Sequence, residues 1–304
     1  MSSIFIFPGQ GSQSVGMGKD LYDNSPAARE VFDEVDNALG QKLSKIIFEG
    51  SMEELTMTAN VQPAIFAVSM AMWAASKTKI SEQDFVAGHS LGEYTALCAA
   101  GALTVHDTAK LLRLRGDAMQ RAVPKGQGAM AVIMGLSIEQ VRGACKTAEQ
   151  QMQESNPNVA DVANDNAPGQ IVISGSETTI LRAMEVTRDM GAKRAILLPL
   201  SVPPHSRLMG SVAIEMQEAL EKIDMKAPIV PLISNKTAAP MLDIAEIKEA
   251  LVYQITHGVR WRETILSLPA LGVTETIEVG PGNVLTGLTQ RIVPELGARK
   301  LEVL

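Results

Sequence analysis

The chain has 304 residues and a formal net charge of −7 at pH 7, and this length allows a large hydrophobic core. The acidic balance argues against non-specific nucleic-acid binding, because neutralising phosphates requires a basic surface. Cys98 and Cys145 are the only cysteines, and their spacing predicts neither a disulfide framework nor a metal site. No targeting segment precedes the first strand and no apolar run is long enough to cross a bilayer, so we expect a cytoplasmic protein.

The first part of the chain has the pattern of an α/β fold. Residues 4–7 are apolar and stop at Pro8-Gly9, which predicts a buried strand that runs into a tight loop. A helix with one polar face is expected near 25–39. The segment 62–76 is apolar nearly all round, which predicts a helix buried beneath the functional site.

A different order of elements begins at residue 127. The expected order β-α-β-β-α-β is that of a ferredoxin-like unit, with residues 164–169 as a loop between its second and third strands. We therefore predict a ferredoxin-like insert over 127–200 in a larger α/β domain formed by 1–126 and 201–304. The expected strands of the insert cover 129–134, 159–163, 170–174 and 193–199, its helices begin at Ser137 and near Glu177, and the larger domain resumes with strands at 229–233 and 276–279.

The sequence Gly-His-Ser-Leu-Gly at 88–92 fits the nucleophile elbow G-x-S-x-G. In such an elbow the serine occupies a strained turn between a strand and a helix. Residues 85–87 and 93–100 have the patterns of that strand and helix, so Ser90 is a candidate nucleophile. The backbone N–H of Leu91 could then donate to an oxyanion. The alternative is a glycine-bounded turn in which Ser90 only caps a helix.

A nucleophilic serine needs a general base, and four histidines are available. His89 adjoins the serine at a strand end, so we expect its side chain on the opposite face. His106 is expected in the first turn of a helix, in contact with solvent. His205 follows two prolines that restrict the backbone, whereas His257 lies in a less defined region. Spacing favours His205 over His257 without excluding His257.

Arg115 is predicted to point inward from a helix over 105–123. At 100° per residue, Val105 and Met119 belong to the buried stripe, and Arg115 lies about 60° from its centre while Arg121 lies on the opposite face. A guanidinium on a buried face needs an anionic partner. The partner could be a carboxylate of the protein or a carboxylate of a substrate.

The loop Gly9-Gln10-Gly11 resembles a phosphate-binding loop only weakly. Ser14 occupies the position of the third glycine of a dinucleotide-binding motif, and no acidic strand end follows at the required distance. The loop is more simply interpreted as bringing its backbone or the Gln10 amide close to the functional site.

Taken together, these motifs resemble those of the malonyl-CoA:acyl carrier protein transacylases of fatty acid synthesis, over essentially the whole chain. The resemblance implies an α/β-hydrolase-like large domain with a ferredoxin-like insert. The motifs are Phe-Pro-Gly-Gln-Gly-Ser-Gln at 7–13, Gln62-Pro63, Gly-His-Ser-Leu-Gly-Glu at 88–93, Arg115-Gly116, Asn-Asp-Asn-Ala-Pro-Gly-Gln at 164–170, Ser-Val-Pro-Pro-His at 201–205 and Glu-Val-Gly-Pro-Gly at 278–282.

The resemblance also implies a role for each matching residue. Ser90 would be the nucleophile and His205 the base, which decides between the two histidines. The backbone N–H groups of Gln10 and Leu91 would form the oxyanion hole.

The remaining implied roles concern the substrate and the base. Arg115 would bind the malonyl carboxylate, with Gln62 lining the pocket and Asn164 near the cleft. The backbone carbonyl at Gln254 would orient His205, so no triad aspartate is expected. Pro204 departs from the small polar or aromatic residue that relatives carry there, which affects the prediction of acyl selectivity.

The implied reaction is ping-pong transfer of a malonyl group from malonyl-CoA to the phosphopantetheine thiol of holo-acyl carrier protein, without a metal or bound cofactor. The sequence calls for nothing larger than a monomer. Because carrier proteins are acidic, docking would use a local basic surface, for which Lys125, Lys193 and Arg194 are candidates.

Three alternatives follow from the same motifs. A serine esterase or thioesterase would share the elbow but end its reaction with water. A related acyltransferase would serve another carrier protein, such as that of a polyketide synthase or malonate decarboxylase. A non-catalytic scaffold would not need Ser90, His205 and Arg115 intact.

Overall fold

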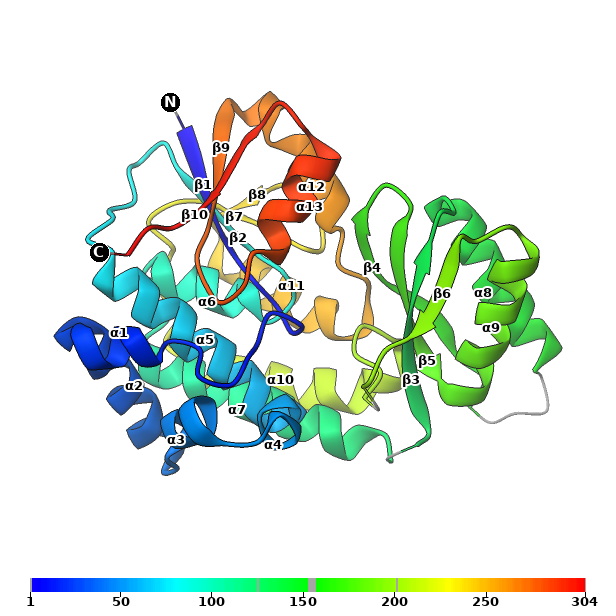
Figure 1. Cartoon of the computed structure of the whole chain (residues 1–304), viewed down its shortest axis with the longest axis horizontal. Helices are drawn as coiled ribbons and strands as arrows, with labels where there is room; N and C mark the ends of the chain where they lie inside the picture. Colours follow the sequence, from blue (N-terminus) through cyan, green and yellow to red (C-terminus); the bar gives the residue numbers. More distant parts are fainter. Residues whose placement is uncertain (1, 125, 153–156, 201, 304) are drawn as a thin grey trace.

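The computed structural model describes residues 2–124, 126–152, 157–200 and 202–303. It has two domains, each built on its own sheet, and Figure 1 shows the smaller one, in green, beside the larger. The prediction of a mixed α/β fold with a separate small antiparallel domain is confirmed. Within the described part of the chain, no helix combines the length and apolar character needed to cross a membrane.

The large domain is built on a six-stranded sheet in the order β10-β9-β1-β2-β7-β8. All neighbouring strands are parallel except the edge pair β7 and β8. Central parallel strands have both faces covered, which explains why residues 4–7 are apolar without a break. The strands are β1 (Ser2–Phe7), β2 (Phe85–Gly88), β7 (Leu232–Ile233), β8 (Pro240–Met241), β9 (Val273–Glu278) and β10 (Gly297–Lys300).

Side chains of β1 alternate between two hydrophobic clusters. Phe5 and Phe7 pack into the larger cluster, whereas Ile4 and Ile6 pack into the smaller one with α12 and α13. Burying both faces of one strand fixes its register, because a shift of one residue would exchange the two sets. The helices of this domain are α1 (Lys19–Asn24), α2 (Pro26–Leu39), α3 (Leu43–Glu49), α4 (Met52–Thr56), α5 (Thr58–Ala75), α6 (Gly92–Ala99), α7 (Val105–Ala122), α10 (Gly210–Lys222), α11 (Ile244–Thr256), α12 (Trp261–Ser267) and α13 (Val284–Ile292).

The small domain has four antiparallel strands in the order β4-β5-β3-β6, which is the ferredoxin-like arrangement for a β-α-β-β-α-β chain. Its two helices pack on one face of the sheet and enclose a hydrophobic cluster. The other face carries a smaller apolar set around Met130 and Val172. The elements are β3 (Gly128–Met134), α8 (Ile138–Gln151), β4 (Ala160–Ala167), β5 (Gln170–Ser176), α9 (Glu177–Asp189) and β6 (Arg194–Leu197), and the predicted capping box of Ser137 and Gln140 opens α8.

Residues 164–167 were expected in a loop but belong to β4. The strand continues because its backbone finds partners in the large domain, where Asp165 N donates to Val259 O and Val259 N donates to Ala163 O. Arg262 pairs with the Asp165 carboxylate across 2.8 Å. The polar run therefore joins the two domains, and only Pro168-Gly169 forms the turn.

Two other boundaries differ from expectation. The buried helix, expected over 62–76, begins at Thr58 and contains Pro63 as an interior residue. The strand expected over 229–233 is limited to Leu232–Ile233, because Ile229 is 65% exposed and its N–H donates to Ala100 O instead of to a neighbouring strand.

Candidate active site

Ser90 lies at the tip of a tight turn between β2 and α6, with the left-handed backbone angle φ of 56°. The turn can form only because glycine stands on both sides. A Cβ on Gly88 would lie 1.9 Å from the Gly92 carbonyl carbon, and one on Gly92 would lie 2.2 Å from Phe7 O. Both distances are far below van der Waals contact, so the elbow is a steric requirement of this sequence.

Ser90 and His205 form a hydrogen-bonded pair, with Oγ 2.8 Å from Nε2 of the histidine. The other ring nitrogen, Nδ1, lies 2.5 Å from the backbone carbonyl of Gln254 and 3.2 Å from that of His257. Because carbonyl oxygens only accept, Nδ1 carries the proton and Nε2 is free to accept one from Ser90. A main-chain carbonyl here takes the orienting role that a carboxylate plays in a serine triad.

Burial, and after it the nearby positive charge of Arg115, lower the pKa of His205 to about 3. The imidazole is therefore neutral at ordinary pH and available as a base. Its backbone has φ of 59°, an unusual value for a residue other than glycine, held by a bond from His205 N to Ile255 O.

Within the described residues, no other histidine side chain forms a hydrogen bond with Ser90. His89 directs Nε2 to Asn166 Oδ1 across 2.8 Å and packs against Trp261. His257 is exposed and stacks on Tyr253, with ring centroids 3.7 Å apart. Only the backbone carbonyl of His257 reaches the pair, through His205 Nδ1.

Arg115 is 1% exposed, as its position on the helix predicts, and its guanidinium lies beside the Ser90 hydroxyl. It donates to Ser90 Oγ at 3.1 Å, to Gln62 Oε1 at 2.6 Å and to Gln254 Oε1 at 2.8 Å. Within the described chain it forms no ion pair with a carboxylate, and its Nε has no hydrogen-bond partner. A buried cation with only neutral partners is a site prepared for an anion.

A cavity of about 390 Å³ lies above these residues and is lined from both domains. The large domain contributes Ser90, Gln10 and Arg115, while the small domain contributes apolar side chains, including Met130 and Val172. The N–H groups of Gln10 and Leu91 make no hydrogen bond to the residues that the structure describes. Asn164 is 6% exposed and also lines this cavity.

The sequence as a whole matches one protein family. A family model of the acyl transferase domain matches residues 4–302. The chain belongs to the acyl transferase family. The protein is therefore an acyltransferase enzyme.

Relatives of this acyltransferase share one name. Malonyl CoA-acyl carrier protein transacylase of Bacillus subtilis (strain 168) is 49% identical over 293 residues, covering 96% of this chain and 91% of the relative. The transacylase of the same name from Escherichia coli (strain K12) is 41% identical over 298 residues, covering 98% and 94%.

Solved structures agree with this grouping. The acyl-carrier-protein S-malonyltransferase of Bartonella henselae matches with a TM-score of 0.94 at 50% identity, covering 99% of this chain and 95% of that one. A malonyl-transacylase in complex with a type II PKS acyl-carrier protein matches with a TM-score of 0.92 at 39% identity, covering 99% and 95%.

Sequence reasoning missed two buried residues that support the site of this acyltransferase. Asn235 accepts from Ser90 N at 2.9 Å and donates to Gly88 O at 2.7 Å, so its side chain spans the elbow. Glu93 accepts from Asn235 N and from the Gln254 side chain. The available signals were a charged residue inside an apolar helix and a polar residue at the carboxyl end of a parallel strand.

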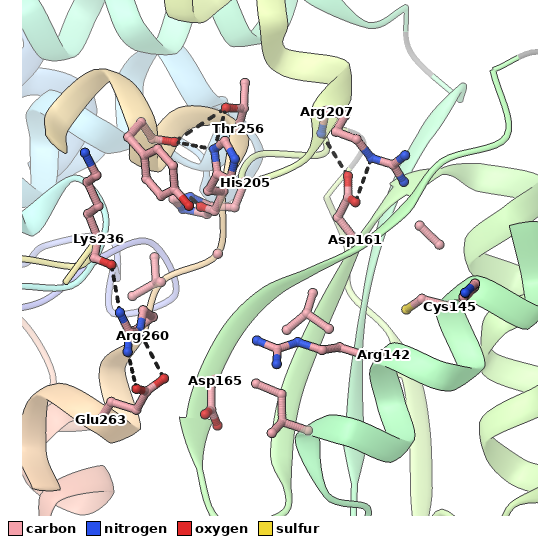
Figure 2. A pocket seen from close by; sticks show the side chains of 18 of the residues that line it. Arg142, Cys145, Asp161, Asp165, His205, Arg207, Lys236, Thr256, Arg260 and Glu263 are labelled. Carbon is pink, nitrogen blue, oxygen red and sulfur yellow. Dashed lines mark hydrogen bonds and ion pairs between the residues drawn. The ribbon is translucent and has the colours of Figure 1, made fainter. Parts of the chain in front are cut away.

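A second cavity, of about 650 Å³, also reaches His205 (Figure 2). Its walls are charged, but most charges are paired within the protein. Arg207 bonds to Asp161, and Arg260 bonds to Glu263 (Figure 2). The Arg207–Asp161 pair joins the two domains, since Asp161 lies on β4 and Arg207 precedes α10 of the large domain. Arg260 and Glu263 both lie at the start of α12.

Proposed function

We propose that this acyltransferase moves a malonyl group from malonyl-CoA to the phosphopantetheine thiol of holo-acyl carrier protein through a malonyl ester of Ser90. The observation that carries the proposal is the buried Arg115 guanidinium, 3.1 Å from the nucleophile and without a carboxylate partner in the described chain. Malonyl differs from acetyl by one carboxylate, and a carboxylate is the partner that this guanidinium lacks among the described residues. The shared name of the relatives supports the same substrate.

The first half of the reaction is acylation of Ser90. Oγ attacks the thioester carbon while its proton passes to His205 Nε2, 2.8 Å away. The thioester oxygen gains the negative charge of the tetrahedral intermediate and is held by the N–H groups of Gln10 and Leu91. The carbon–sulfur bond then breaks, and CoA leaves as a thiol with the proton returned by His205.

The second half reverses these steps with another thiol. His205 takes the proton of the phosphopantetheine thiol as its sulfur attacks the ester carbon. The bond to Ser90 Oγ breaks, and the proton returns to the serine. One site therefore serves two thiols in turn, which is a ping-pong mechanism.

Arg115 is proposed to select the acyl group and to limit hydrolysis. A bidentate guanidinium–carboxylate contact fixes both the position and the orientation of the malonyl group. Gln62 Oε1 accepts a hydrogen bond from one guanidinium nitrogen of Arg115 at 2.6 Å, so the arginine is preorganised. Asn164, from the opposite wall, and the apolar side chains of the small domain narrow the space left for water.

The same proposal extends to the setting of the reaction. Ser90, His205 and the two N–H groups supply the chemistry, so no metal or bound cofactor is required. The two buried free cysteines fit a reducing cytoplasm, and the enzyme is proposed to act as a monomer. The small domain is proposed to span 127–200, between the two parts of the catalytic domain.

Docking of the acidic carrier protein is proposed to use exposed basic side chains near the small domain. Lys193 and Arg194 are exposed at its edge strand. The third candidate, Lys125, lies outside the described residues.

Intact-protein mass after brief exposure to malonyl-CoA or acetyl-CoA tests the proposal. We expect a malonyl adduct that requires Ser90, persists in buffer and is removed by holo- but not apo-carrier protein. Ser90→Ala is the control. Rapid loss of the adduct to water would favour a hydrolase, and removal by a polyketide carrier alone would change the acceptor.

A further inference from the structure

Glu93 is a fully buried carboxylate, 0% exposed, in the first turn of α6. Its two oxygens have separate partners. One accepts from the backbone N–H of Asn235 at 2.7 Å, and the other accepts from Nε2 of Gln254 at 2.8 Å. An ionised carboxylate can only accept hydrogen bonds, so Glu93 requires that the NH₂ end of the Gln254 amide face it.

The orientation of that amide determines what Arg115 meets. With Nε2 directed to Glu93 and to Ser90 O, the Oε1 end of Gln254 accepts from the Arg115 guanidinium at 2.8 Å. A reversed amide would direct NH₂ toward a cation that only donates, and the hydrogen bond would be lost. Glu93, Gln254 and Arg115 therefore form a chain in which each donor–acceptor choice depends on the one before it.

We propose that Glu93 is a positioning residue for recognition of the acyl carboxylate, because it locks the Gln254 amide in the orientation that holds the Arg115 guanidinium beside Ser90. This inference rests on the proposed malonyl specificity and identifies the residue that sustains it. Burial raises the pKa of Glu93 to about 7. Above that pH, Glu93 also supplies the negative charge that balances buried Arg115, through one intervening amide instead of by direct contact. A direct ion pair would occupy the guanidinium, whereas this arrangement leaves it available to a substrate.

Glu93→Gln separates a positioning role from a purely structural one. The glutamine oxygen can still accept from Asn235 N, but its NH₂ then faces Gln254 Nε2. Reversal of the Gln254 amide removes this clash of two donors, but the amide then loses its bonds to both Arg115 and Ser90 O. We expect kcat/KM for malonyl-CoA to fall about tenfold or more relative to that for acetyl-CoA, because acetyl has no carboxylate to misalign.

Glu278→Gln is the matched control. Glu278 is also 0% exposed, and its carboxylate accepts from Leu285 N and from the N–H and hydroxyl of Thr286. Glu278→Gln therefore removes a carboxylate from an equally buried position outside the Glu93–Gln254–Arg115 chain of hydrogen bonds. We expect the malonyl-to-acetyl ratio of this variant to remain that of the wild type even where its urea midpoint falls.

The experiment measures both rates and urea midpoints for wild type, Glu93→Gln, Gln254→Met and the double variant. The double variant should have the same malonyl-to-acetyl ratio as Gln254→Met alone, since that substitution already breaks the hydrogen-bond chain from Glu93 to Arg115. Equal losses on both thioesters in Glu93→Gln, or additive losses in the double variant, would overturn the inference. If Glu93→Gln does not fold, an unchanged ratio in Gln254→Met overturns it and a reduced ratio supports it. If the wild-type protein itself shows no preference for malonyl-CoA over acetyl-CoA, the proposed function is wrong, and not this inference alone.

Discussion

Arg115 donates a hydrogen bond to Ser90 Oγ across 3.1 Å, while the same hydroxyl contacts His205 Nε2 at 2.8 Å. The Ser90 hydroxyl therefore lies between a buried cation and a neutral imidazole. This position allows one guanidinium to touch both the serine hydroxyl and a carboxylate two bonds from the reacting carbonyl carbon.

Replacing Arg115 with alanine should reduce acylation by malonyl-CoA far more than acylation by acetyl-CoA. The lost charge-assisted contact is about 3 kcal/mol, or roughly 100-fold in kcat/KM. Arg115→Lys keeps the charge but lacks the planar pair of donors, so it should recover only part of this loss. The rates follow from adduct mass against time. Equal losses on the two thioesters would contradict a carboxylate-binding role.

Acylation by acetyl-CoA should be nearly independent of pH from about pH 7.5 to about pH 5. Burial and then Arg115 lower the pKa of His205 to about 3, so the base stays neutral over this range. With an ordinary pKa near 6.5, its basic fraction would fall about 30-fold at the lower pH. Malonyl-CoA is unsuitable here, because burial raises the pKa of Glu93 to about 7 and its protonation would disturb Arg115.

The same shift of the His205 pKa has a consequence for stability. The unfolded chain takes up a proton at His205 below about pH 6.5, whereas the folded chain does not until about pH 3. This histidine therefore makes folding less favourable as the pH falls through that range. His205→Gln should remove this contribution, and urea midpoints at several pH values would measure it. An equal decline of stability with falling pH in wild type and variant would contradict it.

Local patterns in the sequence were sufficient to predict the elbow at Ser90 and the inward position of Arg115 on its helix. The glycines on both sides of Ser90 and the helical period around Arg115 are properties of single segments. Glu93, Asn235 and the Gln254 side chain form a network across segments 142 and 161 residues apart. No periodicity reveals such contacts, because they depend on which strand ends meet in the folded sheet.

The loop expected at 164–169 was wrong at 164–167 for a related reason. Its asparagines and aspartate indicate a turn by local propensity, but tertiary pairing with Val259 and Arg262 extended the strand instead. Tertiary contacts override weak local preferences. Pro63 likewise lies inside α5, where burial of both neighbouring turns outweighs the missing N–H.

Adding one methyl group at Gly92 should destabilise the fold strongly. The new Cβ would lie 2.2 Å from Phe7 O in the central strand, so backbone must move, at a cost of about 2–4 kcal/mol. Gly143→Ala is the matched control, because its Cβ meets nothing within 4 Å and it lies inside α8. That change should stabilise by about 0.5–1 kcal/mol. Urea unfolding of both variants measures the contrast, and similar midpoints would contradict the steric argument.

Replacing Asn235 with alanine should slow acylation by malonyl-CoA and acetyl-CoA to the same extent. Its side chain holds Ser90 N at 2.9 Å and Gly88 O at 2.7 Å, and neither contact depends on the acyl group. Losing both leaves buried backbone groups unpaired, at about 1–3 kcal/mol each, and lets the strained elbow relax. We therefore expect a lower kcat with an unchanged malonyl-to-acetyl ratio, the reverse of the pattern for Arg115→Ala. A changed ratio would mean that Asn235 acts on the acyl pocket through Glu93, because its own N–H is bound to that carboxylate.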